Sequence, residues 1–265
     1  MTIDASPSTV ARSPKKVPLI RTWVTTAPYR RFIREIAERA QQRQSSYVCF
    51  ANVHMLMEAY HDPGFNRVVN QADLVAPDGR PLSVLMRWQY GLRQDRVCGM
   101  DLLPDLLRTA AEQDLSVYFY GSTQETLDAI QERLVREHPT LRIAGMESPP
   151  FRPLTTKEDQ AAVDRINASG ANLVFVSLGC PKQERWMADH QGRVQACMLG
   201  LGQAFLTYAG TEKRLPRWAQ DYALEWAYRL YLEPRRLWKR YLVGNSWFLY
   251  QAIISIARSR TRVFE

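Results

Sequence analysis

One local pattern recurs along the chain and constrains its fold more than any other feature. A short apolar run rich in β-formers is followed by a small or polar turn and then by a stretch with helical periodicity. Continuous apolar strands that alternate with helices are typical of a parallel sheet covered on both faces. We therefore expect an α/β fold. The apolar runs lie at residues 47–51, 116–120, 173–178 and 196–199.

In such folds, ligands bind at the carboxyl ends of the strands, where helix N-termini present free N–H groups to phosphates. None of the turns in this chain has the form GxGxxG or GxxxxGK[ST]. These absences count against a dehydrogenase and a P-loop NTPase. The pair Gly200 and Gly202 follows a strand directly, and it fits either a purely geometric turn or a ligand contact.

The net charge of +8 favours an anionic partner, which includes nucleic acid, an anionic membrane and a phosphorylated substrate. Residues 1–45 carry nine Lys/Arg against three Asp/Glu, and residues 228–265 carry eight against two. The middle of the chain is therefore mildly acidic. This distribution predicts a globule with basic ends and argues against a basic groove for nucleic acid.

The four cysteines form no CxxC pair and have no His at zinc-ligand spacing, so a reduced cytosolic protein is expected. The N-terminus has no apolar core segment, which speaks against a secretory signal. Residues 1–18 are expected to be disordered. The late apolar run 247–257 is shorter than the roughly 18 residues that a membrane span needs.

Two acidic candidates sit at turns. Asp78 lies between Pro77 and Gly79 directly after an apolar run, so it is either held rigidly at a strand end or simply caps its own turn. Asp101 opens an apolar helical run, where an acid in the first turn stabilises the helix. Arg96 precedes a glycine turn, and its planar guanidinium suits a phosphate.

Pro181-Lys182-Gln183-Glu184 follows the strand at 173–178, with proline at a favoured first helical position. At a strand end, Lys182 and Gln183 suit a diphosphate and a sugar or base. The alternative is a solvent-exposed first turn in which Glu184 complements the helix dipole.

No metal site and no cofactor are expected. The chain contains no HEXXH and no Asp-x-Asp, the pair on which many sugar-nucleotide transferases hold Mg²⁺ or Mn²⁺. A transferase built on this sequence has to stabilise a leaving diphosphate with its own cations and N–H groups.

Residues 235–242 have a two-sided pattern. At about 100° per residue, Leu237, Trp238, Tyr241 and Leu242 fall on one side of a helix and the basic residues on the other. This is typical of a helix lying on anionic lipid, although a helix docked on the core through its apolar side fits too. The basic residues are Arg235, Arg236, Lys239 and Arg240.

Taken together, the motifs resemble the WecG/TagA/CpsF family of bacterial glycosyltransferases over roughly residues 45–245. The resemblance rests on motifs in the same order as in the family: Phe50-Ala51-Asn52, Pro77-Asp78-Gly79, Arg96 to Leu102, Pro149-Pro150-Phe151, Leu178 to Glu184, Gly200-Leu201-Gly202, Ala209-Gly210, Lys213 to Trp218, and Leu224 to Leu230 followed by Glu233 to Arg236.

The resemblance implies metal-independent, inverting transfer from a UDP-sugar to an undecaprenyl diphosphate-linked saccharide, in exopolysaccharide or other cell-surface polysaccharide synthesis. It implies a Rossmann-like core at residues 19–227, with helices on both faces of a mainly parallel sheet. A basic helical appendage at residues 228–265 would meet the anionic cytoplasmic face of the inner membrane as a peripheral protein.

By position in the family motifs, Asp78 resembles the general base, and Arg96 and Gln183 match active-site positions. Asn52 lies in the expected nucleotide-sugar pocket, and the appendage arginines are expected to close over the diphosphate. The substrate-binding candidates are Asn52, Gly79, Asp101, Lys182, Gly200, Gly202, Arg229, Arg235 and Arg236.

Two positions depart from the family pattern: Phe50 stands where a Thr is usual, and Leu206 stands where an Asp is usual. Both are expected near the pocket, so the donor is expected to differ from N-acetylmannosamine-type sugars, for example a neutral hexose. The alternative function is a non-catalytic module that binds a membrane or nucleic acid; the acidic middle argues against nucleic acid. The oligomeric state stays open, a homo-oligomer included.

Overall fold

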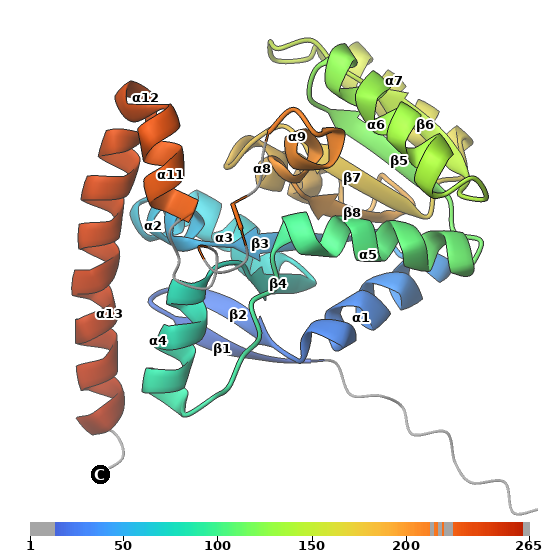
Figure 1. Ribbon diagram of the computed structural model, residues 1–265. Coiled ribbons are helices and arrows are strands. Elements are labelled where there is room, and N and C mark those ends of the chain that lie inside the picture. The colour runs from blue at the N-terminus through green and yellow to red at the C-terminus, as the bar shows by residue number, and fades with distance from the viewer. Residues whose placement is uncertain (1–13, 213–214, 217–218, 220–224, 262–265) are drawn as a thin grey trace, which may run out of the picture.

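The computed structural model describes residues 14–212, 215–216, 219 and 225–261. Its centre is a six-stranded sheet with the spatial order β4-β3-β8-β7-β5-β6, in which every neighbouring pair is parallel (Figure 1). The strands are β3 (Ser46–Ala51), β4 (Leu74–Pro77), β5 (Val117–Gly121), β6 (Ile143–Glu147), β7 (Leu173–Ser177) and β8 (Cys197–Gly200).

Helices cover both faces of this sheet, because successive strand residues point to opposite faces and both sets are apolar. In β5, Tyr118 and Tyr120 pack into one core cluster while Val117 and Phe119 pack into the other. The first cluster contains residues of α2 (Val53–His61), α3 (Pro63–Gln71), α7 (Thr156–Ala168) and α8 (Lys182–His190). The second contains residues of α1 (Tyr29–Gln41), α5 (Gly99–Glu112), α6 (Gln124–Glu137) and α9 (Ala204–Ala209). The expected Rossmann-like α/β core is confirmed.

An antiparallel hairpin of β1 (Lys15–Leu19) and β2 (Thr22–Thr26) packs beside β4. The Thr25 hydroxyl accepts a hydrogen bond from the backbone N–H of Val75 at 2.9 Å, which ties the hairpin to the sheet. The expectation of disorder over residues 1–18 is therefore wrong from Lys15 onward, since these residues are paired with β2. Residues 1–13 lie outside the described part of the chain.

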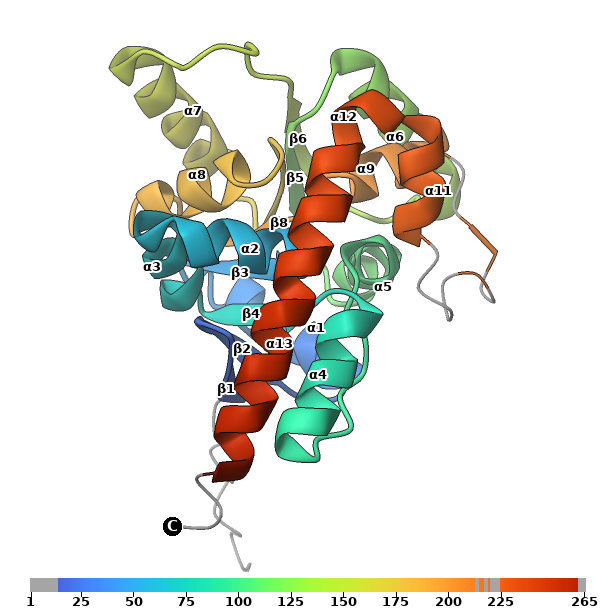
Figure 2. The ribbon, with the colours of Figure 1, turned by 90° about the vertical axis from the view of Figure 1, so that its left-hand side faces the viewer.

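The C-terminal part is helical: α11 (Glu225–Leu232), α12 (Pro234–Trp238), a π-helical turn η1 (Lys239–Val243) and α13 (Gly244–Thr261). Helix α13 lies against α2 and α4 (Arg80–Tyr90), as Figures 1 and 2 show. Phe248 and Ala252 are buried in this contact, and the Gln251 side-chain amide donates to the Tyr60 hydroxyl at 3.1 Å. The appendage is thus packed on the core through part of its surface.

Candidate active site

A cavity of about 550 Å³ opens at the carboxyl ends of the parallel strands. Five strands contribute the residue that ends or closely follows them: Asn52 after β3, Asp78 after β4, Ser122 after β5, Ser177 in β7 and Gly200 in β8. In an open parallel sheet this edge is where ligands bind, because turns from several strands converge there. The cavity therefore occupies the position that the sequence predicted for the site.

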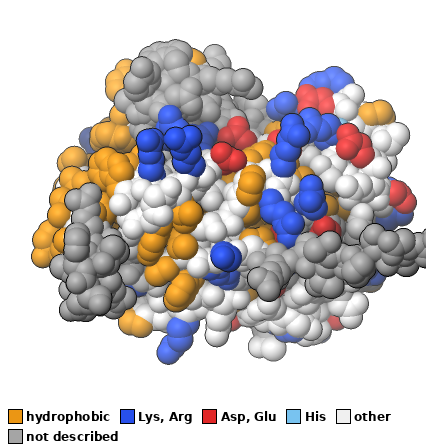
Figure 3. All heavy atoms as spheres, turned by 90° about the horizontal axis from the view of Figure 1, so that it is seen from below, with side chains coloured by type: hydrophobic (Ala, Val, Ile, Leu, Met, Phe, Trp, Pro, Cys, Tyr) orange, Lys and Arg blue, Asp and Glu red, His pale blue; other side chains and the backbone are white. Residues whose placement is uncertain are grey.

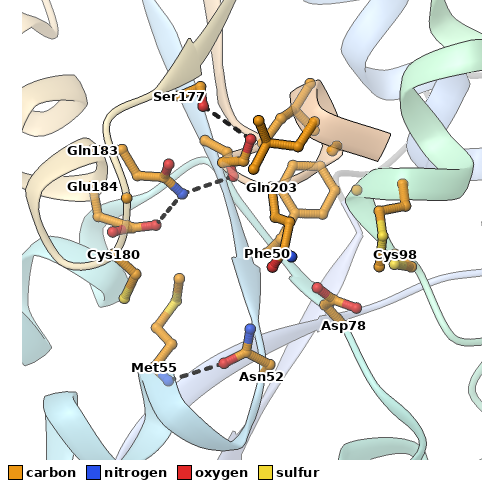
Figure 4. A pocket seen from close by; sticks show the side chains of 18 of the residues that line it. Phe50, Asn52, Met55, Asp78, Cys98, Ser177, Cys180, Gln183, Glu184 and Gln203 are labelled. Atoms are coloured by element: carbon orange, nitrogen blue, oxygen red, sulfur yellow. Dashed lines mark hydrogen bonds between the residues drawn. The ribbon is translucent and has the colours of Figure 1, made fainter. Parts of the chain in front are cut away.

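Three helices of nine or more residues begin at this cavity. Asn52 caps α2, its side-chain oxygen accepting from the Met55 N–H at 3.1 Å, and in Figure 4 its amide nitrogen points away from that helix. Cys98 is the N-cap of α5, and both Cys98 and Gly99 line the cavity. Helix α8 starts after Cys180, which also lines it. Helix N-termini carry free N–H groups and partial positive charge, so this wall favours an anionic ligand.

Asp78 lies on the cavity wall between β4 and α4. Its backbone N–H donates to the Ala51 carbonyl at 2.7 Å, which fixes it against the end of the neighbouring strand β3. Gly79 adopts φ +121°, a conformation that L side chains rarely adopt, and caps α4. The carboxyl group is close enough to Cys98 that its charge adds to burial in raising the pKa of that thiol. The turn thus presents a carboxylate to the cavity. Gly79 is not among the described lining residues, and its contact with a ligand stays a prediction.

Gln183 is buried at the start of α8, and its amide nitrogen donates to the Gly200 carbonyl at 3.0 Å and to Glu184 Oε1 at 2.8 Å (Figure 4). A Cβ atom on Gly200 would lie 3.0 Å from that nitrogen, and one on Gly202 would lie 3.2 Å from the Gln183 amide oxygen. The two glycines line the cavity and also make room for the Gln183 side chain. Both glycines therefore have a role in packing the Gln183 side chain.

Glu184 is the residue whose placement the sequence did not settle. Instead of standing in a solvent-exposed first turn, it is fully buried and lines the cavity. Burial raises the pKa of its carboxyl group above the ordinary value, although hydrogen bonds from Gln183 and Cys180 oppose that shift. The exposed alternative for this turn is wrong for Glu184, because Gln183 and Glu184 are buried although Lys182 before them is exposed.

Three other predicted residues lie around the cavity rather than on its wall. Arg96 and Asp101 pair with each other, with Arg96 Nη2 3.1 Å from Asp101 Oδ2. Asp101 is in the first turn of α5, as expected, and Lys182 is exposed at the start of α8. None of the three is among the described residues that line the cavity, so their contact with a ligand stays a prediction.

The appendage reaches the cavity through Glu233, which precedes α12 and lines the wall. Arg235 is exposed in α12. The backbones of Arg229 and Arg236 belong to α11 and α12, but their side chains lie outside the described part of the structure. The regular helical step assumed for 235–242 does not hold, because Lys239–Val243 form a π turn. Leu237 is buried and Leu242 is 57% exposed, while the side chains of Arg236, Lys239 and Arg240 lie outside the described part of the structure.

The charged side chains among the described lining residues are all carboxylates: Asp78, Glu184, Glu212 and Glu233. Glu212 accepts a hydrogen bond from the Gln203 amide, and Ser177 donates to the Gly202 carbonyl at 2.9 Å. Sequence reasoning missed Ser122, Ser177, Gln203, Glu212 and Glu233. Only Ser122 and Ser177, which lie at strand ends, carried a usable signal. Over the described residues, no group of three or more His, Cys, Asp or Glu is arranged to hold a metal ion.

An exposed apolar surface runs along α4 and α13, which lie side by side. Figure 3 shows hydrophobic side chains gathered on one side of the molecule, with Lys and Arg side chains nearby. We call these residues the apolar face: Val84, Trp88, Leu249, Tyr250 and Ile253, exposed by 39%, 65%, 60%, 55% and 60%. In the described part of the chain, no helix combines the length and apolarity required to cross a bilayer.

Comparison with known proteins agrees with the geometry. The model of the family "Glycosyl transferase WecG/TagA/CpsF" matches residues 17–262. A protein of Bacillus spizizenii is 32% identical over 202 residues, 76% of each chain, and one of Staphylococcus aureus is 26% identical over 227 residues, 84% of each chain. Both are named N-acetylglucosaminyldiphosphoundecaprenol N-acetyl-beta-D-mannosaminyltransferase. The chain thus belongs to the WecG/TagA/CpsF family of glycosyl transferases.

Proposed function

We propose that this protein transfers a sugar from a UDP-sugar to a saccharide carried on a polyprenyl diphosphate, with inversion at the anomeric carbon. The observation that carries the proposal is the position of Asp78, a carboxylate held at the strand-end cavity in a chain of this family. The names of the two relatives support the lipid-linked acceptor, since they specify N-acetylglucosamine on diphosphoundecaprenol.

In this proposal Asp78 is the general base. The acceptor hydroxyl oxygen attacks the anomeric carbon of the donor while the bond from that carbon to the UDP oxygen breaks, and its electron pair leaves with UDP. The hydroxyl proton passes to the Asp78 carboxylate. A single displacement needs only one carboxylate at the acceptor, and it inverts the configuration.

The departing UDP carries negative charge, and the described lining side chains add four carboxylates to it. The N-termini of α2, α5 and α8 offset part of this charge. We assign the rest to Arg96 and to the appendage arginines Arg229, Arg235 and Arg236, and we propose that no metal ion takes part. Because Glu233 already lines the cavity, the appendage segment that carries these arginines is adjacent to it.

The donor is set by the wall of the cavity. Phe50 and Leu206, the two departures from the family pattern, both line it. Replacing polar side chains by these apolar ones removes hydrogen-bonding groups from the pocket. We therefore propose a donor with fewer polar contacts at these positions than an N-acetylmannosaminyl donor, such as a neutral hexose for a cell-surface polysaccharide.

The acceptor places the reaction at a membrane. We propose that the protein binds the cytoplasmic face of the inner membrane peripherally, through the apolar face and the basic appendage. Apolar side chains buried at the lipid interface and basic residues near anionic headgroups both favour such binding.

The test is UDP release from a panel of UDP-sugars by the purified protein, with a short-chain polyprenyl diphosphate-sugar as acceptor and EDTA in the buffer. Acceptor-dependent release with one donor is expected. Release only after a divalent ion is restored would contradict the metal-free mechanism. Silence across the panel from folded protein would favour a non-catalytic binding module.

A further inference from the structure

The side-chain amide of Gln183 has a fixed orientation. Its nitrogen lies between two oxygens, the Gly200 carbonyl at 3.0 Å and Glu184 Oε1 at 2.8 Å. A backbone carbonyl can only accept, so the group that faces Gly200 must be the amide nitrogen. Both N–H bonds of the amide are therefore used inside the protein, one by each oxygen.

The amide oxygen of Gln183 is left over. It is buried and has no hydrogen-bond partner among the described residues, although Gln183 lines the cavity. Buried polar atoms in folded proteins nearly always have a partner, so an unpaired one at a cavity wall marks a place where a ligand completes the bonding. Because the free group is a carbonyl oxygen, the ligand must supply an N–H or O–H donor.

Glu184 holds this arrangement in place. It is fully buried, and its other carboxyl oxygen, Oε2, also lacks a described partner. Burying a carboxyl group costs free energy, and hydrogen bonds within the protein offset only part of that cost here. The carboxyl group receives hydrogen bonds from Gln183, from its own backbone N–H and from Cys180, so it is held in place as an acceptor beside the Gln183 amide.

The glycines on the other side make the orientation depend on Glu184. Gly200 and Gly202 leave the Gln183 amide room, because a Cβ at either position would lie within 3.2 Å of it. Neither glycine has a side chain that could fix the orientation of the amide about its last bond. The hydrogen bond from Gln183 to Glu184 supplies the second fixed point after the Gly200 carbonyl.

We propose that Glu184 is a positioning residue, which holds the Gln183 amide so that its oxygen accepts a hydrogen bond from an N–H or O–H group of the nucleotide-sugar donor. This inference rests on the proposed function for the identity of the ligand. It deepens that proposal by assigning the polarity of the contact: Gln183 accepts and does not donate.

The test is a double-mutant cycle with Glu184→Met, Gln183→Met and the double variant, in the full-length protein. Glu184→Met is expected to raise the KM for the UDP-sugar about tenfold, with a smaller change in kcat. In the Gln183→Met background the same change should add less than about twofold, because Glu184 acts through Gln183. Glu184→Gln keeps an acceptor for the Gln183 N–H and is expected to restore KM to within about threefold.

Glu35→Met is the matched control. Glu35 is a buried glutamate on α1 that is ion-paired with Arg31 and Arg39, and it is not among the described residues that line the cavity. This variant should lower the Tm and leave KM unchanged. Calorimetric binding of UDP and of the UDP-sugar then shows which part of the ligand carries the N–H or O–H group that Gln183 accepts from. Weaker binding of both ligands assigns the contact to the nucleotide, and weaker binding of the UDP-sugar alone assigns it to the sugar.

Nuclear magnetic resonance of the ligand-free protein separates this inference from the proposed function. Both Gln183 side-chain amide protons should exchange slowly in the wild type and in Glu184→Gln, and quickly in Glu184→Met. Additive effects in the cycle, a Glu184→Gln variant as impaired as Glu184→Met, or rapid exchange in the wild type would each overturn the positioning role. Slow exchange without turnover on any donor would sink the proposed function instead.

Discussion

Asp78 shows how a single residue is fixed by its neighbours in the chain. Strand β4 ends at Pro77, the Asp78 N–H donates to Ala51, and Gly79 takes a backbone conformation that permits the turn into α4. The backbone thus positions the carboxyl group, and a change of its chemistry should leave the turn intact.

Asp78→Asn should lower kcat by a factor of about 10² to 10⁴, because the amide cannot accept the proton from the acceptor hydroxyl. The affinity for UDP should stay within about threefold of the wild type. Steady-state kinetics and calorimetry on the same preparation measure both quantities. A variant that turns over normally, or one that loses UDP binding together with its fold, would refute the assigned role.

Glu184 makes a second prediction at this scale, concerning stability against pH. Burial raises its pKa above the ordinary 4.5, so the folded protein binds this proton more tightly than the unfolded chain. The associated stability is complete below pH 4.5 and is lost as the pH rises through the raised pKa, by about 1.4 kcal/mol per pH unit within that window.

Glu184→Gln removes the titrating group, so the Tm of the variant relative to the wild type should increase as the pH rises above about 4.5. Thermal unfolding of both proteins across this range gives the difference directly. A difference that stays constant with pH would show that the carboxyl group keeps an ordinary pKa in the fold.

At the scale of elements, α13 has one surface that is buried and one that is exposed. Phe248 and Ala252 are buried against the core, while Leu249 and Ile253, each one residue further on, are 60% exposed. The inner surface fixes the helix on α2 and α4. The outer surface keeps apolar side chains in water, which favours their burial at a membrane interface.

The double substitution Leu249→Glu and Ile253→Glu should reduce sedimentation with anionic liposomes by about tenfold or more, because it puts two negative charges into the membrane contact. Val135→Glu on α6 is the matched control, since Val135 is 63% exposed and lies outside the apolar face. Equal sedimentation of all three proteins would remove α13 from the membrane contact.

The elements that the sequence predicted are those with fully buried strands. In β3, β5 and β8 every residue is buried, so the sequence shows continuous apolar runs. Strand β6 escaped prediction because all its residues are only partly buried at the sheet edge and Gly145 interrupts the apolar run. Strand β1 was hidden by Lys15, Lys16 and Pro18, whose composition matches that of a disordered tail.

Asp78 was predicted at the strand end because its Pro-Asp-Gly turn directly follows an apolar run, whereas Asn52 was assigned to the pocket through the family resemblance. Glu184 could not be placed, because a first-turn acid has the same local sequence whether its helix faces solvent or the sheet. Glu212 and Glu233 come from segments far from any strand end, and only tertiary packing brings them to the cavity. The π turn at Lys239–Val243 likewise cannot be read from hydrophobic periodicity.

At the scale of the whole molecule, charge is divided between the ends of the chain and the wall of the cavity. The two ends of the chain are basic, while the described charged residues of the cavity wall are acidic. A lipid-linked diphosphate acceptor fits both charge distributions. Its anionic diphosphate suits the basic appendage, and its sugar hydroxyl suits the carboxylate at the strand ends. A transferase acting on such an acceptor therefore explains more of the molecule than a binding module does.

The structure of the lipid-linked product tests this account most directly. The protein would be incubated with a UDP-α-sugar and a polyprenyl diphosphate-linked saccharide, and the product characterised by mass and by the anomeric proton in its magnetic resonance spectrum. We predict an acceptor extended by one sugar in β linkage, because a single displacement at the anomeric carbon, with Asp78 as the base, inverts the α configuration of the donor. An α-linked product, or an acceptor of unchanged mass beside hydrolysed donor, would contradict it.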